Sequence, residues 1–278
     1  MNAFECFVYA LQAEMEEPPL YGWFHLLSLA LLAVGTYLLC RFLKDAGWRR
    51  VRLFLTVALV AMALAELYKQ TVFSLTVTDS VASWNYEWYS FPYQFCSTPL
   101  YVLPFAILSR EGRLRDATLS FLSSFSLFGG LVVMIYPGDV YVETVGINLQ
   151  TMLHHGLQVA IGIFLCVWLR RRISRRYFLS GVVVFLIAAA VAVALNIGVH
   201  HALLAAGNNE TFNMFFISPY HDCTLPLLSL IAPHLPYPLF LVLYLLGFSV
   251  AAALMHGAAY GIITLIKQHR EGHLHAAQ

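Results

Sequence analysis

Long apolar stretches separated by short polar connections run through most of this chain of 278 residues. Seven of the stretches have roughly the 20 residues that a helix needs to cross the hydrocarbon core of a bilayer. They cover residues 22–43, 51–75, 91–109, 116–136, 147–169, 177–203 and 237–266. The pattern predicts an all-α, polytopic membrane protein of about seven transmembrane helices, with residues 1–278 forming a single domain. Residues 213–232 are apolar but interrupted by prolines, so we interpret them as a re-entrant or half-helical piece.

The composition agrees with a membrane protein. Hydrophobic residues make up 60% of the chain and charged residues only 11%, whereas a soluble domain carries about 25% charged residues. The net charge is +1 and no basic patch is interleaved with aromatic residues, so we expect no nucleic-acid partner. The five cysteines include no CxxC pair, so the sequence indicates no disulfide framework, no metal site and no other cofactor. No signal peptide is predicted, because the amino-terminal region lacks Lys and Arg.

The connections between the segments differ in charge. Lys and Arg gather in the first, third and fifth connections and in the tail: Lys44, Arg49, Arg50, Arg52, Arg110, Arg113, Arg115, Arg170, Arg171, Arg172, Arg175, Arg176, Lys267 and Arg270. The other connections contain acids and neither Lys nor Arg: Asp79, Glu87, Asp139, Glu143 and Glu210. Because basic loops stay cytoplasmic, we predict a multi-pass protein of the cell membrane with its amino terminus outside and its carboxyl terminus in the cytoplasm.

The third segment, residues 91–109, carries the first candidate for chemistry. Polar residues fill its first third, including Gln94 and Cys96, and Pro99 and Pro104 interrupt it. Polar groups and broken backbone at membrane depth are unfavourable unless neighbouring protein satisfies them, so they often mark function. The alternative is that Cys96 is a small apolar filler, which is the common role of a buried cysteine.

Other polar residues gather at a similar depth. With a rise of 1.5 Å per residue, Cys96, His155 and Asn196 lie about 8, 13 and 10 Å below the outer surface. Glu66 and Lys69 also lie in the outer part of their segment, three residues apart. The alternative for these two charged residues is a purely structural ion pair. The sequence therefore predicts a polar site in the outer half of the membrane.

Cysteine and histidine together indicate nucleophilic chemistry. An imidazole that takes the proton of a thiol makes a thiolate able to attack an acyl group. A third group usually orients such an imidazole, and Asn196, Glu66 and Asp222 are the candidates. His154 and His155 diverge by about 100° on a helix. We therefore expect only one of them to face the interior, and we predict that this residue is His155.

Several motifs resemble a known family. They are FPYQFC at 91–96, FGG at 128–130, YP at 136–137, HGLQV at 155–159, Asn196, and NMFFISP…LLSLIAPHLPYPLF from 213 to 240. The chain resembles the YwaF family of bacterial integral membrane proteins. The animal relatives of that family include an ether-phospholipid acyltransferase, and the AIG/ADTRP fatty-acid-ester hydrolases are more distantly similar. The resemblance implies a nucleophilic Cys96, an essential His155, and a phospholipid or other acyl lipid as substrate. Gln94 stands where the resemblance leads us to expect a histidine.

These observations favour a lipid acyltransferase or acyl-ester hydrolase that forms a thioester in an outer-leaflet pocket. Cys96 and His155 would be catalytic, and the supporting residues would be Asn196, Glu66, Asp222, Gln94, His154 and His200. One alternative is a lipid-binding protein or transporter without enzymatic activity. Another is a zinc-dependent hydrolase of the ceramidase type, which would need three well-placed ligands, but no predicted segment contains an HxxxH pattern.

Overall fold

A computed structural model describes residues 3–78 and 81–276 of the chain. The helices are α1 (Ala3–Leu11), α2 (Trp23–Leu43), α3 (Trp48–Ser74), α4 (Pro99–Leu108), α5 (Arg113–Phe121), α6 (Leu127–Ile135), α7 (Val145–Trp168), α8 (Arg175–Ala205), α9 (Leu228–Ile231) and α10 (Tyr237–Ala276). The strands β1 (Leu75–Thr78) and β2 (Val81–Trp84) form an antiparallel hairpin in which Leu75 pairs with Trp84.

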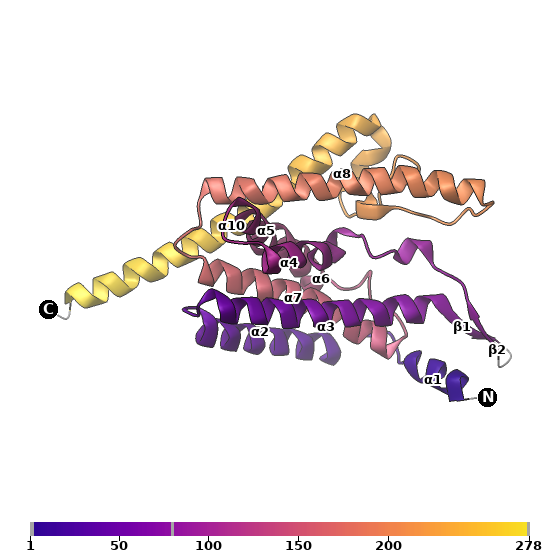
Figure 1. Cartoon of the computed structure of the whole chain (residues 1–278), viewed down its shortest axis with the longest axis horizontal. Helices are drawn as coiled ribbons and strands as arrows, with labels where there is room; N and C mark the ends of the chain where they lie inside the picture. The colour runs from indigo at the N-terminus through magenta and orange to yellow at the C-terminus, as the bar shows by residue number, and fades with distance from the viewer. Residues whose placement is uncertain (1–2, 79–80, 277–278) are drawn as a thin grey trace.

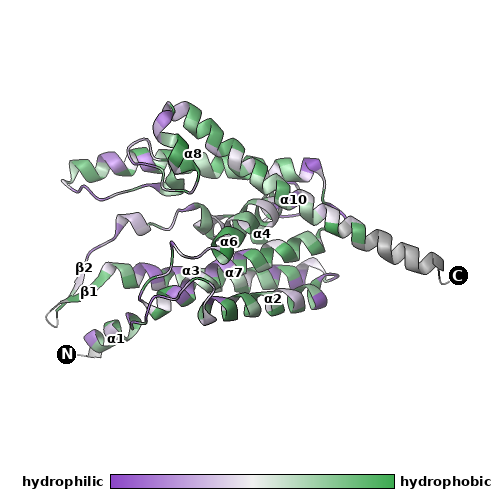
Figure 2. Ribbon diagram, turned by 180° about the vertical axis from the view of Figure 1, so that it is seen from behind, coloured by the Kyte–Doolittle hydropathy of each residue, from purple (hydrophilic) through white to green (hydrophobic). Residues whose placement is uncertain are grey.

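The predicted all-α polytopic architecture is confirmed. In the described part of the chain, six helices are long and apolar enough to cross a bilayer. They are α2, α3, α7, α8, Tyr237–Ile262 of α10, and the continuous helix Arg113–Ile135, which joins α5 to α6 through a π-helical turn at Leu122–Ser126. Hydrophobic residues dominate the helices that run along the bundle (Figure 2). These spans match six of the seven predicted segments to within a few residues.

The remaining predicted segment, 91–109, is not a full-length helix. Its first residues are extended or turn-like, and only Phe95–Leu108 is helical. Proline explains the break, because Pro92 and Pro99 cannot donate a backbone hydrogen bond and the residue before a proline avoids the helical region. Pro99 occupies the start of α4, where a proline is tolerated. The entry to α4 is therefore irregular at the position of Cys96.

The segment 213–232, expected to be a re-entrant or half-helical piece, has little regular structure. It contains only a 3₁₀ turn at Met214–Phe216 and the four-residue α9, followed by a 3₁₀ turn at Ala232–His234. Phe215 and Phe216 both adopt positive φ angles, 60° and 57°, which a helix cannot accommodate. The segment is nevertheless buried near its start, where Met214 and Phe215 are fully enclosed.

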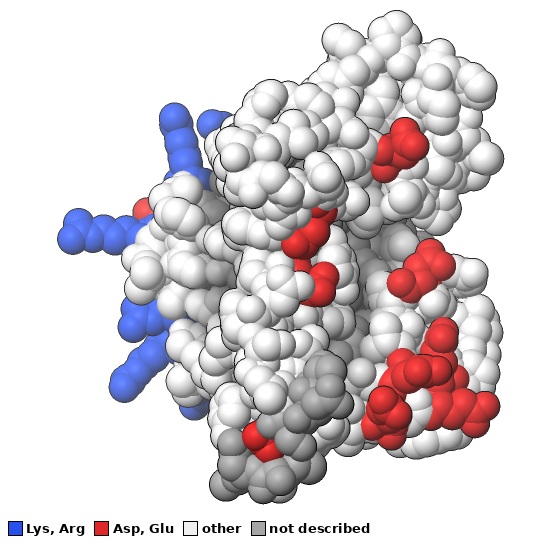
Figure 3. Space-filling model, turned by 90° about the vertical axis from the view of Figure 1, so that its right-hand side faces the viewer, with Lys and Arg blue, Asp and Glu red and all other residues white. Residues whose placement is uncertain are grey.

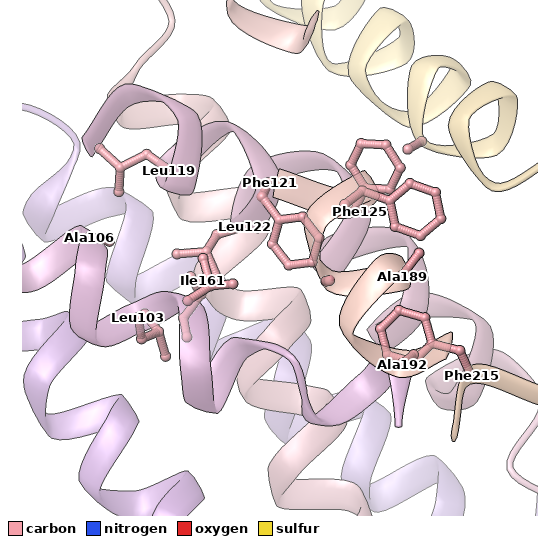
Figure 4. Packing of buried hydrophobic residues seen from close by; sticks show 14 of the residues in the cluster. Leu103, Ala106, Leu119, Phe121, Leu122, Phe125, Ile161, Ala189, Ala192 and Phe215 are labelled. Atoms are coloured by element: carbon pink, nitrogen blue, oxygen red, sulfur yellow. The ribbon is translucent and has the colours of Figure 1, made fainter. Parts of the chain in front are cut away.

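Helix α7 lies at the centre of the bundle. It packs against α2, α3 and α6, while α8 packs against α5 on the opposite side of the molecule (Figure 1). Stacked aromatic rings join the helix Arg113–Ile135 to α8: the ring of Phe125 lies 5.7 Å from that of Phe121 (Figure 4) and 4.6 Å from that of Phe185, between centroids. The first half of α7, which holds the histidines, is therefore enclosed by protein.

The two ends of the bundle carry opposite charge. At one end, Arg170 pairs with Asp45 and Arg172 pairs with Glu111, so the first, third and fifth connections lie together. We call this the basic end. Acidic residues gather at the other end, around α1 and the hairpin (Figure 3). The charge separation agrees with the predicted sidedness, which stays a prediction. Asp79 lies outside the described residues, and the side chains of Lys267 and Arg270 are not described.

Two elements at the acidic end are not among the predicted ones, α1 and the β1–β2 hairpin. Gln12, which follows α1, donates its amide to the carbonyls of Val72 and Leu75, and Tyr68 donates its hydroxyl to the carbonyl of Leu11. The amino-terminal region is thereby held against the end of α3. These long-range contacts leave no periodic pattern in the sequence.

Candidate functional site

Cys96 lies in a one-turn 3₁₀ helix, Phe95–Ser97, that leads directly into α4. Its backbone carbonyl lies 3.0 Å from Nε2 of His154 and accepts a hydrogen bond of 2.9 Å from the side-chain amide of Gln158. His154 and Gln158 are four residues apart on α7, so they share one face of that helix. Two side chains of α7 thus hold the irregular backbone at Cys96, as buried main-chain groups require.

Two glycines of α6 bring this helix against the same point. A Cβ atom on Gly129 would lie 2.8 Å from the ring of Phe95, and one on Gly130 would lie 2.8 Å from Cβ of Gln158 and 2.9 Å from the carbonyl oxygen of His155. Side chains larger than hydrogen would therefore push α6 away. Gly129 and Gly130 thus allow α6 to pack closely against α7 and the turn at Phe95.

His154 and His155 are both buried, with 2% and 7% of their surfaces exposed. The expectation that only one could face the interior is wrong, because α7 is enclosed by neighbouring elements on most of its sides. The two side chains nevertheless differ in their contacts. His154 meets the carbonyl of Cys96, whereas Nδ1 of His155 lies 2.8 Å from the carbonyl oxygen of Thr151 and its Nε2 has no partner among the described residues.

The group that orients His155 is therefore the main chain of Thr151. Glu66, one of the three predicted partners of the imidazole, is bound elsewhere. It pairs with Lys69 at 2.8 Å and accepts a hydrogen bond of 2.8 Å from Gln70, whose amide also reaches the carbonyl of Ser90. The structural ion pair of Glu66 and Lys69 is thus present.

Gln94 and Asn196 hold a different segment, the strained turn at residues 213–217. Gln94 donates to the carbonyl of Asn213 and accepts from the backbone N–H of Phe215, at 3.0 and 2.9 Å. Asn196 donates to the carbonyl of Met214 and accepts from its N–H, at 3.0 and 2.7 Å. Residues with positive φ persist only where the surroundings fix them, and these two amides supply that constraint.

The other predicted supporting residues lie toward the outside of the site. The backbone carbonyl of Asp222 accepts from Asn213. His200 stacks on Tyr220, with 3.8 Å between ring centroids. In the part of the chain that the structure describes, no three His, Cys, Asp or Glu side chains are grouped to hold a metal ion. The zinc-hydrolase alternative therefore has no ligand set in that part of the chain.

Several buried polar side-chain atoms on α7 and α3 lack a hydrogen-bond partner among the described residues. They are Nδ1 of His154, Nε2 of His155, Oε1 of Gln158 and Oε1 of Gln70. Most buried polar atoms in folded proteins are hydrogen-bonded, and each exception needs an explanation. Water or the polar part of a ligand can supply these partners. We refer to Cys96, His154, His155 and Gln158 as the Cys96 group.

Lys69 adds a positive charge to this region. Its ammonium interacts electrostatically with Cys96, His154 and His155. Such a cation can stabilise the negative charge that develops on a thiolate or on a tetrahedral oxyanion. Sequence reasoning assigned no functional role to Lys69 or Gln158. The four-residue spacing of His154 and Gln158 is the signal that could have identified Gln158.

Two cavities flank the site. The outer cavity, about 500 Å³, is lined by Lys69, Gln94, His221 and Asp222 among others. The apolar groove, about 470 Å³, runs between α2, α3 and α7 and is lined by residues such as Leu32, Leu153 and Gly156. Cys96 is not among the lining residues of either cavity. The outer cavity reaches Gln94, two residues before it.

Comparison with known proteins identifies a family. Residues 20–260 match the model of the TMEM164 family. No curated protein and no solved structure matches the chain. The resemblance to YwaF proteins, to the ether-phospholipid acyltransferase and to the AIG/ADTRP hydrolases therefore still depends on the sequence motifs alone.

Proposed function

The chain belongs to the TMEM164 family of membrane proteins, and we propose that it is an acyl-lipid enzyme of the cell membrane that uses Cys96 as its nucleophile and His155 as its general base. The observation that carries this proposal is the Cys96 group itself. A cysteine on irregular backbone has its carbonyl against the buried imidazole of His154, next to His155 on α7, and each imidazole has one nitrogen without a partner among the described residues.

The proposed reaction has two steps. Nε2 of His155 takes the proton of the Cys96 thiol, and the sulfur attacks the carbonyl carbon of an acyl ester. The ester C–O bond breaks, the departing lysolipid oxygen takes the proton from the imidazolium, and the acyl group remains on Cys96 as a thioester. The hydroxyl of a second lysolipid, or water, then attacks the thioester while His155 accepts the proton and returns it to the sulfur.

The hydrogen bond to Thr151 supports this role for His155. When the carbonyl of Thr151 accepts a hydrogen bond from Nδ1–H, Nε2 is the unprotonated nitrogen that a base requires. A general base must reach its proton directly or through one water molecule. Nε2 of His155 has no partner among the described residues, so this nitrogen is open to accept a proton.

The two cavities suit the two parts of a phospholipid. The apolar groove offers almost only hydrocarbon surface, as an acyl chain requires. The outer cavity is lined by Lys69, which pairs with Glu66, and by His221, and both side chains can contact a polar headgroup. If the basic connections are cytoplasmic, as the sequence predicts, the outer cavity opens toward the outer leaflet. A phospholipid is therefore the proposed substrate, with a lysolipid or water as the acceptor.

A second candidate function is lipid binding or transport without covalent chemistry. It is favoured by one observation, that Cys96 does not line either cavity among the described residues. In that case the open polar atoms would bind a headgroup or water, and the thiol would not react.

A lipid-like, thiol-reactive probe, an alkyl chloroacetamide, distinguishes the two functions. We expect it to label Cys96 in preference to Cys40 and Cys166, and we expect His155→Ala to slow the labelling at least about tenfold, because the imidazole makes the thiolate. His154→Ala is the matched control and should change the labelling rate far less. Labelling that does not depend on His155 would favour the binding protein.

A further inference from the structure

A cavity of about 490 Å³ lies at the basic end of the molecule, far along the chain from the Cys96 group. It opens between the start of α8 and the middle of α10, and Ile173, Ser174, Arg175, Phe178, His256 and Tyr260 line it. Its volume is within the range of about 300–1,000 Å³ that is typical of small-molecule sites. We call it the basic-end cavity.

His256 is the buried polar residue of this cavity. Only 9% of its surface is exposed, and its ring packs 5.3 Å from Phe178 and 6.3 Å from Tyr177 between centroids. The ring lies beside the backbone of Ser174, yet neither nitrogen has a well-aligned hydrogen-bond partner among the described residues. A buried imidazole with both nitrogens open is unfavourable, and a polar group in the cavity would satisfy it.

Positively charged groups also border this cavity. Helix α8 begins at Arg175 and runs for 31 residues. Its N-cap Ser174 accepts from the N–H of Tyr177, and the other N–H groups of the first turn form a positive helix end. Among the neighbouring arginines, Arg170 pairs with Asp45, and Arg172 pairs with Glu111 and Asp116. No acid partner of Arg175 occurs among the described residues, which leaves its guanidinium free to bind an anion.

We propose that the basic-end cavity binds a phosphate group, either on the headgroup of a membrane lipid or on a soluble phosphate compound. Arg175 supplies a two-pronged cation, the start of α8 supplies N–H donors, and His256 donates from the buried wall. Phe178 and Ile173 supply an apolar wall for the rest of the ligand. Basic pockets between transmembrane helices at the cytoplasmic side are known to take phospholipid headgroups. The site is independent of the Cys96 chemistry.

Binding to the purified full-length protein in detergent tests this proposal. The probes are dihexanoyl phosphatidylglycerol, the corresponding diacylglycerol without phosphate, and inorganic phosphate. We expect phosphatidylglycerol to bind and diacylglycerol not to bind. Arg175→Gln should weaken phosphatidylglycerol binding about tenfold or more, as should His256→Gln, because each removes a direct contact. Arg176→Gln, at the exposed neighbour that does not line the cavity, should change it less than about twofold.

Each result of the binding experiment has a different meaning for the proposal. Competition by inorganic phosphate at similar concentration would identify a soluble phosphate compound as the ligand class, and failure to compete would identify the lipid headgroup. Equal weakening by Arg175→Gln and Arg176→Gln would show diffuse charge attraction and overturn the proposal, as would equal binding of diacylglycerol. Arg175 is exposed, so its variant is expected to fold even if His256→Gln does not. Thermal midpoints without ligand check this.

Discussion

Two neighbouring groups of buried amide and imidazole side chains differ in how completely their hydrogen bonds are made. In the first, Gln94, Asn196 and Asn213 use both the donor and the acceptor of each side chain to hold the turn at residues 213–217. In the second, the Cys96 group, buried atoms of His154, His155 and Gln158 have no described partner. The two groups approach within two residues along the chain, at Gln94 and Cys96.

The difference separates side chains that stabilise the fold from side chains that are open to a ligand. A fully satisfied network fixes one conformation and leaves nothing for a ligand, whereas open polar atoms are unfavourable unless something else satisfies them. Substitutions in the first group should therefore affect folding more than turnover. Substitutions of Cys96 or His155 should affect turnover more than folding. The predictions below test this separation, from the largest expected effect to the smallest.

The largest effect is expected at His155. His155→Ala should lower acyl transfer or hydrolysis about 10²–10⁴-fold, which is the usual contribution of a general base, and it should leave the thermal midpoint nearly unchanged. His154→Ala removes the contact to the carbonyl of Cys96 and should cost about 1 kcal/mol of stability. Lipid turnover per folded molecule, measured by mass spectrometry, separates the two. Equal losses of activity would contradict the assignment of His155 as the base.

Asn196→Ala should give the converse result. It leaves the buried N–H and C=O of Met214 without partners, and each such group costs about 1–3 kcal/mol. We expect a total loss of about 2–6 kcal/mol in the free energy of unfolding, measured by denaturation in detergent, with turnover per folded molecule largely retained. Asn196→Asp keeps the side-chain acceptor, so its free energy of unfolding should lie between those of Asn196→Ala and the wild type. A stable but inactive Asn196→Ala protein would place Asn196 in the reaction instead.

Gly130→Ala tests the contact between α6 and α7 that frames both groups. The added methyl would meet Cβ of Gln158 and the carbonyl of His155, and overpacking of this kind costs about 1–3 kcal/mol. Gly198→Ala on α8 is the control, since nothing lies within 4 Å of its added carbon. The thermal midpoint should fall for the first variant and stay level or rise for the second. A similar result for both would show that α6 can move away freely.

The transmembrane spans could be predicted because the bilayer leaves few alternatives to long apolar helices. The gathering of polar residues at one depth was also visible in the sequence. The contacts within the site were not visible in the sequence, because one partner in each of them is a main-chain atom. The carbonyl of Thr151 orients His155, and the carbonyl of Cys96 receives His154 and Gln158. Side-chain types along the chain do not specify such partners.

The roles of Gln94 and Asn196 depended on an irregular segment. Gln94 contacts residues 119 and 121 positions away, in a turn whose positive φ angles at two phenylalanines no propensity predicts. The hydrophobic pattern likewise did not indicate that segment 91–109 begins with non-helical backbone. The site residues named from the sequence therefore stay a prediction, and the sequence could not separate those that hold the fold from those that remain open.

The smallest effect concerns the basic end. The Arg170 guanidinium hydrogen-bonds the carboxyl of Asp45 and holds its pKa below the usual value. A carboxyl with a lowered pKa in the folded state contributes stability above its unfolded pKa, which is lost as the pH falls through the folded pKa. Asp45→Asn should therefore lower the thermal midpoint slightly at pH 7, and the difference should shrink below about pH 4. A difference that grows in acid would contradict this.

The central claim is that Cys96 carries the acyl group, and intact-mass analysis of the purified protein after incubation with phospholipid tests it most directly. The account predicts a mass increase equal to one acyl chain that hydroxylamine removes, that peptide mapping locates at Cys96, and that Cys96→Ala abolishes. Cys166→Ala should leave the adduct intact. A protein that turns over lipid without such an adduct, or an adduct that persists in Cys96→Ala, would contradict the account.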